Sequence, residues 1–264
     1  MIAGTTKLFA IVGDPVAQAR SPEVFNALFR RRGVDAAMVP LHVRADDFAP
    51  VLSALRSVEN FCGLVVTVPH KRAAARAAAQ RSERAATAGA ANVLRPCAGG
   101  WEADLLDGEG FAAGLARNGI DPRGKRCAIV GAGGAGAAIA LALCERAAQS
   151  VCVSDIEPDR AASLARRLVG HGHPAVAAAP DRTADLVVNA TPLGMAETDL
   201  LPFDPTSLAP GAIVADVIMQ PSLTRLLREA ARLGHRTVEG RHMLDGQAEP
   251  IWRFFGLPDA ATGG

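Results

Sequence analysis

The sequence lacks an excess of charge of either sign. Its 264 residues include 28 lysines and arginines and 27 aspartates and glutamates, which gives a formal net charge of +1. Nucleic acids and anionic membranes select for a basic surplus, so neither is expected as a partner. Functions that involve small molecules are therefore favoured.

The sequence also lacks any C-x-x-C pair, and its cysteine count is odd. The five cysteines are Cys62, Cys97, Cys127, Cys144 and Cys152. A disulfide framework or a zinc knuckle is therefore not expected, and a reducing cytoplasm fits best. His171 and His173 lie in a glycine-containing loop without an acidic neighbour, so we expect no metal site. A basic segment followed by an apolar one is missing at the N-terminus, and no signal peptide is expected.

One long uncharged run, residues 127–144, resembles a membrane span by length. It contains four glycines and changes character halfway along. A strand, a tight turn and a buried helix explain it better than a bilayer span of about 20 residues. We expect a soluble protein with no membrane partner.

Apolar strand patterns alternate with helical patterns from the start of the chain. Strands are expected at residues 7–13, 38–43, 63–69, 92–94, around Trp101, and at 127–130, 151–155, 175–179, 185–191 and 212–218. Helices are expected from Ser21, as an N-cap, to Gly33, and at 48–55, 73–91, 107–118, 137–148, 222–234 and 243–256, with a kink or break at Pro250. The alternation predicts an α/β fold with parallel strands, and the helix at 107–118 as the crossing between two lobes.

The segment GAGGAG (131–136) follows an apolar strand and opens a helix. It matches G-x-G-x-x-G at Gly131, Gly133 and Gly136, whose glycines permit the turn, the approach of backbone to a pyrophosphate, and close helix packing. Asp155 ends the next predicted strand, where a carboxylate accepts hydrogen bonds from ribose hydroxyls and repels a 2′-phosphate. This context predicts a dinucleotide site that prefers NAD to NADP. The alternatives are a glycine-rich turn and an aspartate that caps the next helix.

The segment GLVVTVPHK (63–71) begins as a buried strand and ends in a lysine. Lys71 is either a solvated lysine at a helix start or an amine delivered to a cleft for chemistry.

Together, eight segments resemble the shikimate/quinate dehydrogenase family over nearly the whole chain. In order they are GDPVAQARSP, GLVVTVPHK, AGAANVL, LLDGEGF, GAGGAG, VVNATPLGM, ADVIMQPSLTRLL and GRHMLDGQA. The resemblance implies an N-terminal α/β substrate lobe, a Rossmann-type dinucleotide-binding lobe and a cleft between them. It places the substrate lobe at residues 1–107, the dinucleotide lobe at 108–240 and a C-terminal helix that returns to the first lobe at 241–264. It also implies a soluble oxidoreductase, as in aromatic amino acid biosynthesis.

The resemblance assigns roles to individual residues. Lys71 and Asp107 would be a catalytic dyad on either side of the substrate hydroxyl. Substrate contacts are expected from Ser21, Thr67, Asn92 and Gln247, and Arg20 is a further candidate. Cofactor contacts are expected from Gly131, Gly133, Gly134, Ala135, Gly136, Asp155, Asn189, Thr191, Pro192, Met195, Val217, Gly240 and Met243. The alternatives are purely structural roles: a helix-capping Asp107, a turn residue at Asn92 and a surface amide at Gln247.

Four departures from the family pattern remove polar groups. Ala19 stands where the family has the first serine of S-x-S-P, and Val65 replaces an asparagine in N-V-T-x-P-x-K. Leu105 and Leu106 precede Asp107 where N-T is usual, and Met219 replaces the tyrosine of Y-N-P in a chain that has no tyrosine. Losing one such contact costs about 1–3 kcal/mol, so weak or no activity on shikimate is expected.

The sequence therefore predicts a divergent, cytoplasmic, NAD-dependent dehydrogenase of a cyclic hydroxy acid, as a monomer or homodimer. The alternatives are a dehydrogenase for an amino, deoxy or carboxylate-free analogue, and a binding protein without catalysis.

Overall fold

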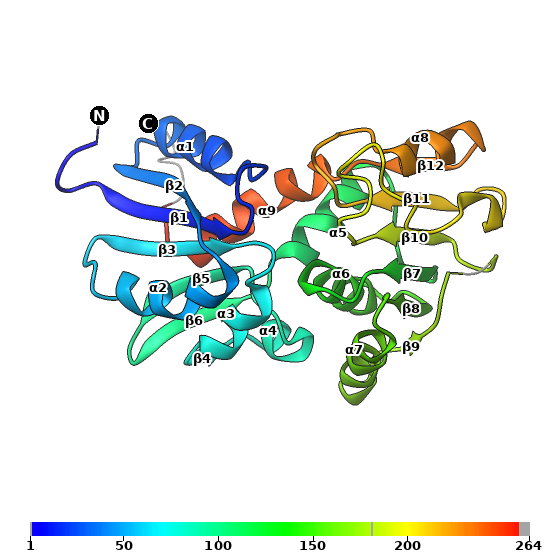
Figure 1. Cartoon of the computed structure of the whole chain (residues 1–264), viewed down its shortest axis with the longest axis horizontal. Helices are drawn as coiled ribbons and strands as arrows, with labels where there is room; N and C mark the ends of the chain where they lie inside the picture. The colour runs from blue at the N-terminus through cyan, green and yellow to red at the C-terminus, as the bar shows by residue number, and fades with distance from the viewer. Residues whose placement is uncertain (1, 181, 259–264) are drawn as a thin grey trace. The chain divides into compact units, whose positions relative to one another are not determined.

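The computed structural model describes residues 2–180 and 182–258. They divide into two compact units. One comprises the residues up to Leu106 together with those from Ala248 onward, and the other is Asp107–Gln247. Each unit contains one six-stranded sheet (Figure 1). The roles expected for the predicted ranges 1–107, 108–240 and 241–264 stay predictions.

The sheet of the first unit is mixed. Its strand order is β2-β1-β3-β5-β6-β4, with β1, β2 and β3 parallel and β5 antiparallel to both β3 and β6. The strands are β1 Lys7–Gly13, β2 Ala36–His42, β3 Phe61–Val66, β4 Gln80–Arg81, β5 Val93–Cys97 and β6 Gly100–Asp104. The helices are α1 Ser21–Arg31, α2 Phe48–Leu55, α3 Lys71–Ala77 and α4 Glu83–Ala88, with a 3₁₀ turn, η1, at Ala45–Asp47. The parallel strands at its start and the hairpin of β5 and β6 agree with the sequence pattern.

Aromatic side chains form the core on one face of this sheet. Phe9 of β1 packs against Phe29 of α1 and against Phe255, with ring centroids 5.5 and 4.9 Å apart. Trp252, from the last part of α9 (Arg241–Phe254), is fully buried, and its ring centroid lies 5.7 Å from that of Phe29. The end of α9 thus contributes to the core of the first unit.

The sheet of the second unit is entirely parallel. Its order is β12-β11-β10-β7-β8-β9, which is the doubly wound order of dinucleotide-binding folds. The strands are β7 Arg126–Val130, β8 Ser150–Ser154, β9 Ala175–Ala177, β10 Leu186–Asn189, β11 Ile213–Asp216 and β12 Arg236–Val238. The helices are α5 Asp107–Arg117, α6 Gly134–Glu145, α7 Pro158–Gly170 and α8 Arg225–Arg232, with a 3₁₀ turn, η2, at Pro205–Ser207. The predicted fold class is confirmed.

Glycines bring the helices of the second unit into close contact. A Cβ on Gly108 of α5 would lie 2.3 Å from the carbonyl oxygen of Ala138 in α6. A Cβ on Gly110 would lie 2.5 Å from the carbonyl oxygen of Met243 in α9. Side chains at these positions would force the helices apart.

The expectation of one helix over residues 73–91 is wrong. Ala78 is extended, with φ −73° and ψ 134°, and the chain then forms the short strand β4. Ser82 starts α4 because its side chain accepts a hydrogen bond from the N–H of Ala85. The abundant alanine and arginine concealed this N-cap. The strand β12 was also not expected.

No helix among the described residues is long and apolar enough to cross a membrane. The uncharged run at 127–144 is β7, a turn and α6, as the sequence predicts.

Candidate active site

Lys71 lies where the chain passes from β3 into α3. The strand ends at Val66, a loop follows, and Lys71 is the first residue of α3. Its side chain is not solvated, because only 9% of the residue is exposed. The N–H of Ala91 donates to the carbonyl oxygen of Lys71 at 2.9 Å and fixes its backbone. This burial argues against the solvated-lysine interpretation.

His70 anchors the start of α3. Its ring is 1% exposed and stacks on Phe48, with centroids 4.7 Å apart and planes at 9°. Its Nε2 lies 2.7 Å from the carbonyl oxygen of Val43. Sequence reasoning did not assign His70 a role, because nothing in the motif indicates that Phe48 lies against it. These contacts of His70 fix the backbone directly before Lys71.

Asn92 is buried at the end of the neighbouring strands. Its Oδ1 accepts from the N–H of Leu106 at 2.7 Å, and its own N–H donates to the carbonyl oxygen of Asp104 at 3.0 Å. Its carbonyl oxygen accepts from the N–H of Val66 at 2.7 Å. Asn92 therefore joins the ends of β3 and β6 beside the Lys71–Ala91 contact.

Thr67 follows β3 directly and is half-buried. Its N–H donates to the carbonyl oxygen of Val12 in β1 at 2.9 Å. A Cβ on Gly13 would lie 2.5 Å from Cγ2 of Thr67, so the end of β1 approaches this loop closely. The structure thus brings Thr67, Lys71 and Asn92 to one region at the carboxyl edge of the first sheet.

Ser21 is buried as the first residue of α1, and the preceding Arg20 occupies the N-cap position. The expected serine N-cap is therefore wrong by one residue. The guanidinium of Arg20 pairs with the carboxylate of Glu23 at 3.0 Å, with 46% of the arginine side chain exposed. Ala19 packs against the apolar core of the unit. Ser21 is the one hydroxyl retained from the family's pair of serines.

Asp107 and Gln247 meet in the second unit. Asp107 begins α5 and is 3% exposed, and Nε2 of Gln247 donates to its Oδ1 at 3.0 Å. Gln247 is 7% exposed, so it is not a surface amide. Lys71 belongs to one unit and Asp107 to the other, and their action as a dyad stays a prediction.

The glycine loop between β7 and α6 is shaped for close approach of a ligand. Gly131 has φ +106°, and a Cβ on Gly136 would lie 1.8 Å from the carbonyl oxygen of Gly131. A Cβ on Gly133, by contrast, would meet no described atom within 4 Å. Gly134 and Ala135 begin α6, whose first N–H groups are available to an anion. These residues fit a dinucleotide pyrophosphate.

Asp155 follows β8 and ties that strand to the glycine loop. Its Oδ2 accepts from the N–H of Ala132 at 2.7 Å, and its Oδ1 accepts from the N–H of Glu157 at 2.9 Å. The helix α7 begins only at Pro158, with Glu157 at the N-cap, so Asp155 does not cap it. Each carboxylate oxygen keeps acceptor capacity for a ribose hydroxyl. Arg160 pairs with Glu157 at 2.7 Å.

Asn189 ends β10 and is fully buried, with its side-chain amide bonded inside the protein. Its Oδ1 accepts from the N–H and the hydroxyl of Thr191, at 3.0 and 2.7 Å. Its Nδ2 donates to the carbonyl oxygen of Leu193 at 3.0 Å and to Asp216 at 3.1 Å. The loop it supports carries Pro192 and Met195, which are exposed.

Asp199 closes the far side of this loop. Its Oδ2 accepts from the N–H groups of Gly194 and Ala196, at 2.8 and 3.0 Å. These backbone donors lower the pKa of Asp199. The loop is therefore held at both ends by side-chain acceptors.

Three further predicted cofactor residues, Val217, Gly240 and Met243, lie close together. A Cβ on Gly240 would lie 2.7 Å from the carbonyl oxygen of Val217, and the N–H of Met243 donates to the carbonyl oxygen of Gly240 at 3.0 Å. Glycine at 240 therefore permits the start of α9 to reach the loop after β11.

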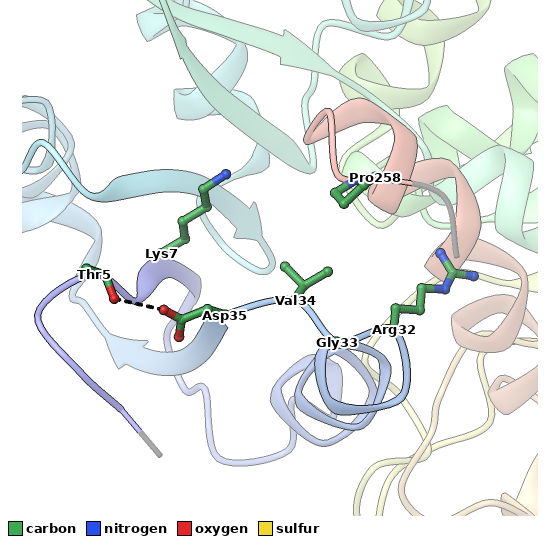
Figure 2. A pocket seen from close by; sticks show the side chains of 7 residues that line it. All are labelled: Thr5, Lys7, Arg32, Gly33, Val34, Asp35 and Pro258. Carbon is green, nitrogen blue, oxygen red and sulfur yellow. Dashed lines mark hydrogen bonds between the residues drawn. The ribbon is translucent and has the colours of Figure 1, made fainter. Parts of the chain in front are cut away.

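A pocket of about 310 Å³ lies elsewhere in the first unit (Figure 2). It is lined by Thr5, Lys7, Arg32, Gly33, Val34, Asp35 and Pro258. Lys7 begins β1, so the pocket lies at the amino edge of the sheet, whereas Thr67 and Lys71 lie at its carboxyl edge. None of the predicted site residues lines it. Within residues 2–180 and 182–258, no group of three or more histidines, cysteines, aspartates or glutamates is placed to hold a metal.

Comparison with known proteins identifies the family. The family model described as the shikimate dehydrogenase substrate binding domain matches residues 11–94, which lie in the first unit. A shikimate dehydrogenase (NADP(+)) of Acidiphilium cryptum is 40% identical over 252 residues, which cover 95% of this chain and 90% of that protein.

Similar solved structures support the same family assignment. The quinate dehydrogenase of Corynebacterium glutamicum in complex with NAD is 30% identical, with a TM-score of 0.84 over 97% of this chain and 96% of the other. The 5-ketofructose reductase of Gluconobacter sp. strain CHM43 is 28% identical, with a TM-score of 0.83 over 98% and 96% of the two chains. The chain therefore belongs to the shikimate dehydrogenase family, and is an oxidoreductase of that type with a dinucleotide cofactor.

Proposed function

We propose that the protein interconverts a ring hydroxyl and a ketone of a cyclic hydroxy acid of the quinate and shikimate kind, with NAD as its cofactor. The burial of Lys71 at the carboxyl edge of the first sheet carries this proposal. A buried ammonium is costly unless it has a task or a partner, and Thr67 and Asn92 in the same region supply polar groups for a polyhydroxylated ligand.

The proposed chemistry follows from these residues. In the oxidative direction Lys71, as a neutral amine, takes the hydroxyl proton while the hydride leaves the C–H bond, and in the reverse direction the resulting ammonium returns that proton. Asp107 would balance the positive charge of the ammonium that forms, and its carboxylate is oriented by the hydrogen bond that it accepts from Gln247. The nicotinamide of a bound dinucleotide would accept or return the hydride. Thr67, Asn92 and Ser21 would orient the remaining polar groups of the ring.

Asp155 supports NAD as the cofactor. The name of the Acidiphilium cryptum relative specifies NADP(+), whereas the quinate dehydrogenase structure contains NAD. In this chain a carboxylate occupies the end of β8, and the nearby Arg160 is paired with Glu157. A 2′-phosphate would therefore meet a negative charge and an arginine that is already engaged.

We expect the wild-type protein to use NAD at least about tenfold more efficiently than NADP, and Asp155→Ser to shift that ratio toward NADP by about 100-fold, because the substitution removes both the ribose acceptor and the repulsion. Steady-state kcat/KM for each cofactor measures this. Asp159→Ser, which removes an exposed carboxylate in the first turn of α7, is the matched control and should leave the ratio unchanged. A wild-type preference for NADP would reject the NAD assignment.

The proposed substrate class is tested with a panel of candidate compounds at alkaline pH. Reduction of NAD is measured with quinate, shikimate and other cyclic hydroxy acids, and with the same rings lacking the carboxylate. We expect a cyclic acid to give the highest kcat/KM, with shikimate weaker because Ala19 removes one hydroxyl, and Ala19→Ser to raise kcat/KM for shikimate by about tenfold. No turnover of any acid would reject the proposed substrate class.

A second candidate function is the reduction of a polyhydroxy ketone that has no carboxylate. Two observations favour it: Ala19 offers no hydroxyl, and Arg20 is paired with Glu23. The similar 5-ketofructose reductase shows by its name that a protein of this fold acts on such a ketone. The carboxylate-free compounds of the panel, and polyhydroxy ketones assayed with NADH, distinguish the two functions.

A further inference from the structure

We propose that Asp216, which lies in the segment ADVIMQPSLTRLL but has no role assigned from the sequence, is a positioning residue that acts as an ionised carboxylate and fixes the positions of the loops of the dinucleotide site. This inference rests on the dinucleotide site of the proposed function. Asp216 is the last residue of β11 and is 2% exposed. It pairs in register with Asn189, the last residue of β10, at the carboxyl edge where doubly wound sheets bind ligands.

Both oxygens of the Asp216 carboxylate accept hydrogen bonds from neighbouring groups. Oδ1 accepts from the N–H of Ile218 at 3.0 Å and from Nδ2 of Asn189 at 3.1 Å, and Oδ2 accepts from the hydroxyl of Thr224 at 2.8 Å.

The orientations of the two side-chain donors are fixed by other contacts. The N–H of Thr191 faces Oδ1 of Asn189, which turns Nδ2 of that amide toward Asp216. The hydroxyl of Thr224 accepts from the N–H of Leu227 at 3.3 Å, so its proton is available to Asp216. A carboxylate that receives three donors has no need of a proton of its own.

These donors belong to separate segments of the site. Asn189 also bonds Thr191 and Leu193 of the loop after β10. Ile218 belongs to the loop after β11, and a Cβ on Gly240 would lie 2.4 Å from its carbonyl oxygen. Thr224 caps α8 through Leu227. Asp216 thus links the loop after β10 with the loop after β11, and through the latter with the start of α9.

The loop after β10 in turn meets the glycine loop. The N–H of Ala190 donates to the carbonyl oxygen of Val130 at 2.8 Å, and a Cβ on Gly131 would lie 2.8 Å from the carbonyl oxygen of Ala190. A shift of Asn189 would therefore move atoms that touch the turn expected to hold the pyrophosphate. Asp216 itself is buried behind these loops and acts through them.

Burial raises the pKa of Asp216, against the opposing effect of hydrogen bonds from Ile218, Thr224, Asn189 and Val217. The ionised form is thus costly to bury and persists because its neighbours supply the donors. An isosteric amide would direct an NH₂ group at one or more of those donors and leave a buried donor without an acceptor.

The test compares Asp216→Asn, Thr224→Val and Thr224→Ser with the wild type in full-length protein. Kd for NADH and for NADPH is measured by fluorescence titration, and KM for cofactor and for substrate by steady-state kinetics. We expect Asp216→Asn to weaken dinucleotide binding about tenfold and Thr224→Val about threefold, with substrate KM within twofold of wild type. Thr224→Ser keeps the hydroxyl and should bind dinucleotide as the wild type does.

Amide hydrogen exchange gives a readout that needs neither substrate nor cofactor. Faster exchange in Asp216→Asn is expected at residues 190–195 and 217–224, with β7 and β8 unchanged. Unchanged exchange in those loops, or dinucleotide affinity within twofold of wild type in folded Asp216→Asn, would overturn the inference. If Asp216→Asn does not fold, equal affinity and equal exchange in Thr224→Val and Thr224→Ser would overturn it. Failure of the wild type to oxidise any hydroxy acid would reject the proposed substrate class and leave this exchange result standing.

Discussion

Replacement of Lys71 by methionine is expected to lower kcat by about 10²–10⁴-fold, which is the range that general acid–base catalysis contributes. Methionine retains most of the length and apolar volume of the buried side chain and removes the amine. Cofactor affinity, measured by fluorescence titration of NADH, should stay within twofold of wild type because the glycine loop and Asp155 lie in the other unit.

Lys7→Met is the matched control for this change. Lys7 lies on the same sheet at its amino edge and is exposed, so its replacement should leave kcat unchanged (Figure 2). Circular dichroism and thermal unfolding establish that both variants are folded. A folded Lys71→Met protein with kcat within tenfold of wild type would refute the assignment of Lys71 as the proton acceptor.

The second large effect is expected for Asp107→Asn. The amide keeps the shape of the buried carboxylate at the start of α5 and removes its charge, while its oxygen can still accept from Nε2 of Gln247. We expect kcat to fall by about 10²–10³-fold. Glu109→Gln, which neutralises another carboxylate in the first turn of α5, should have little effect on kcat.

The double variant Lys71→Met/Asp107→Asn tests whether the two residues act as one. Residues of a catalytic unit are strongly non-additive, so the double variant should be no more than about threefold slower than Lys71→Met alone. Independent roles would instead multiply the two losses. Multiplication of the losses would contradict the dyad even if each single variant were inactive.

The strands could be predicted because buried parallel strands are short apolar runs. The strands expected at residues 7–13, 63–69 and 127–130 correspond to β1, β3 and β7, although β3 runs from Phe61 to Val66, and the glycine loop after β7 was placed by its spacing. The run at 73–91 failed because its alanines have high helix propensity throughout. A serine N-cap at Ser82 and the ladder with β6 decided the structure there.

Site residues could be proposed from the sequence only where a recognisable motif points to a chemical role. Lys71, Asn92 and Asp155 could be proposed because they stand near the ends of recognisable strands; Lys71 and Asn92 are buried and Asp155 is half-buried, and their roles stay predictions. His70 and Asp216 were not predicted to matter. The role of His70 depends on Phe48, and that of Asp216 depends on the register of β10 with β11. Such partners are far apart in the sequence and meet only when the sheet forms.

The hydrogen bond between Asp107 and Gln247 joins the first and last residues of the second unit. The chain therefore enters and leaves that unit at adjacent points, as an inserted domain does. The first unit is correspondingly discontinuous, because the residues after Gln247 complete a core begun by β1 and α1. A nascent chain must therefore finish synthesis of the whole second unit before Trp252 and Phe255 are available to Phe9 and Phe29. The first unit, although encoded first, is the last to complete its core.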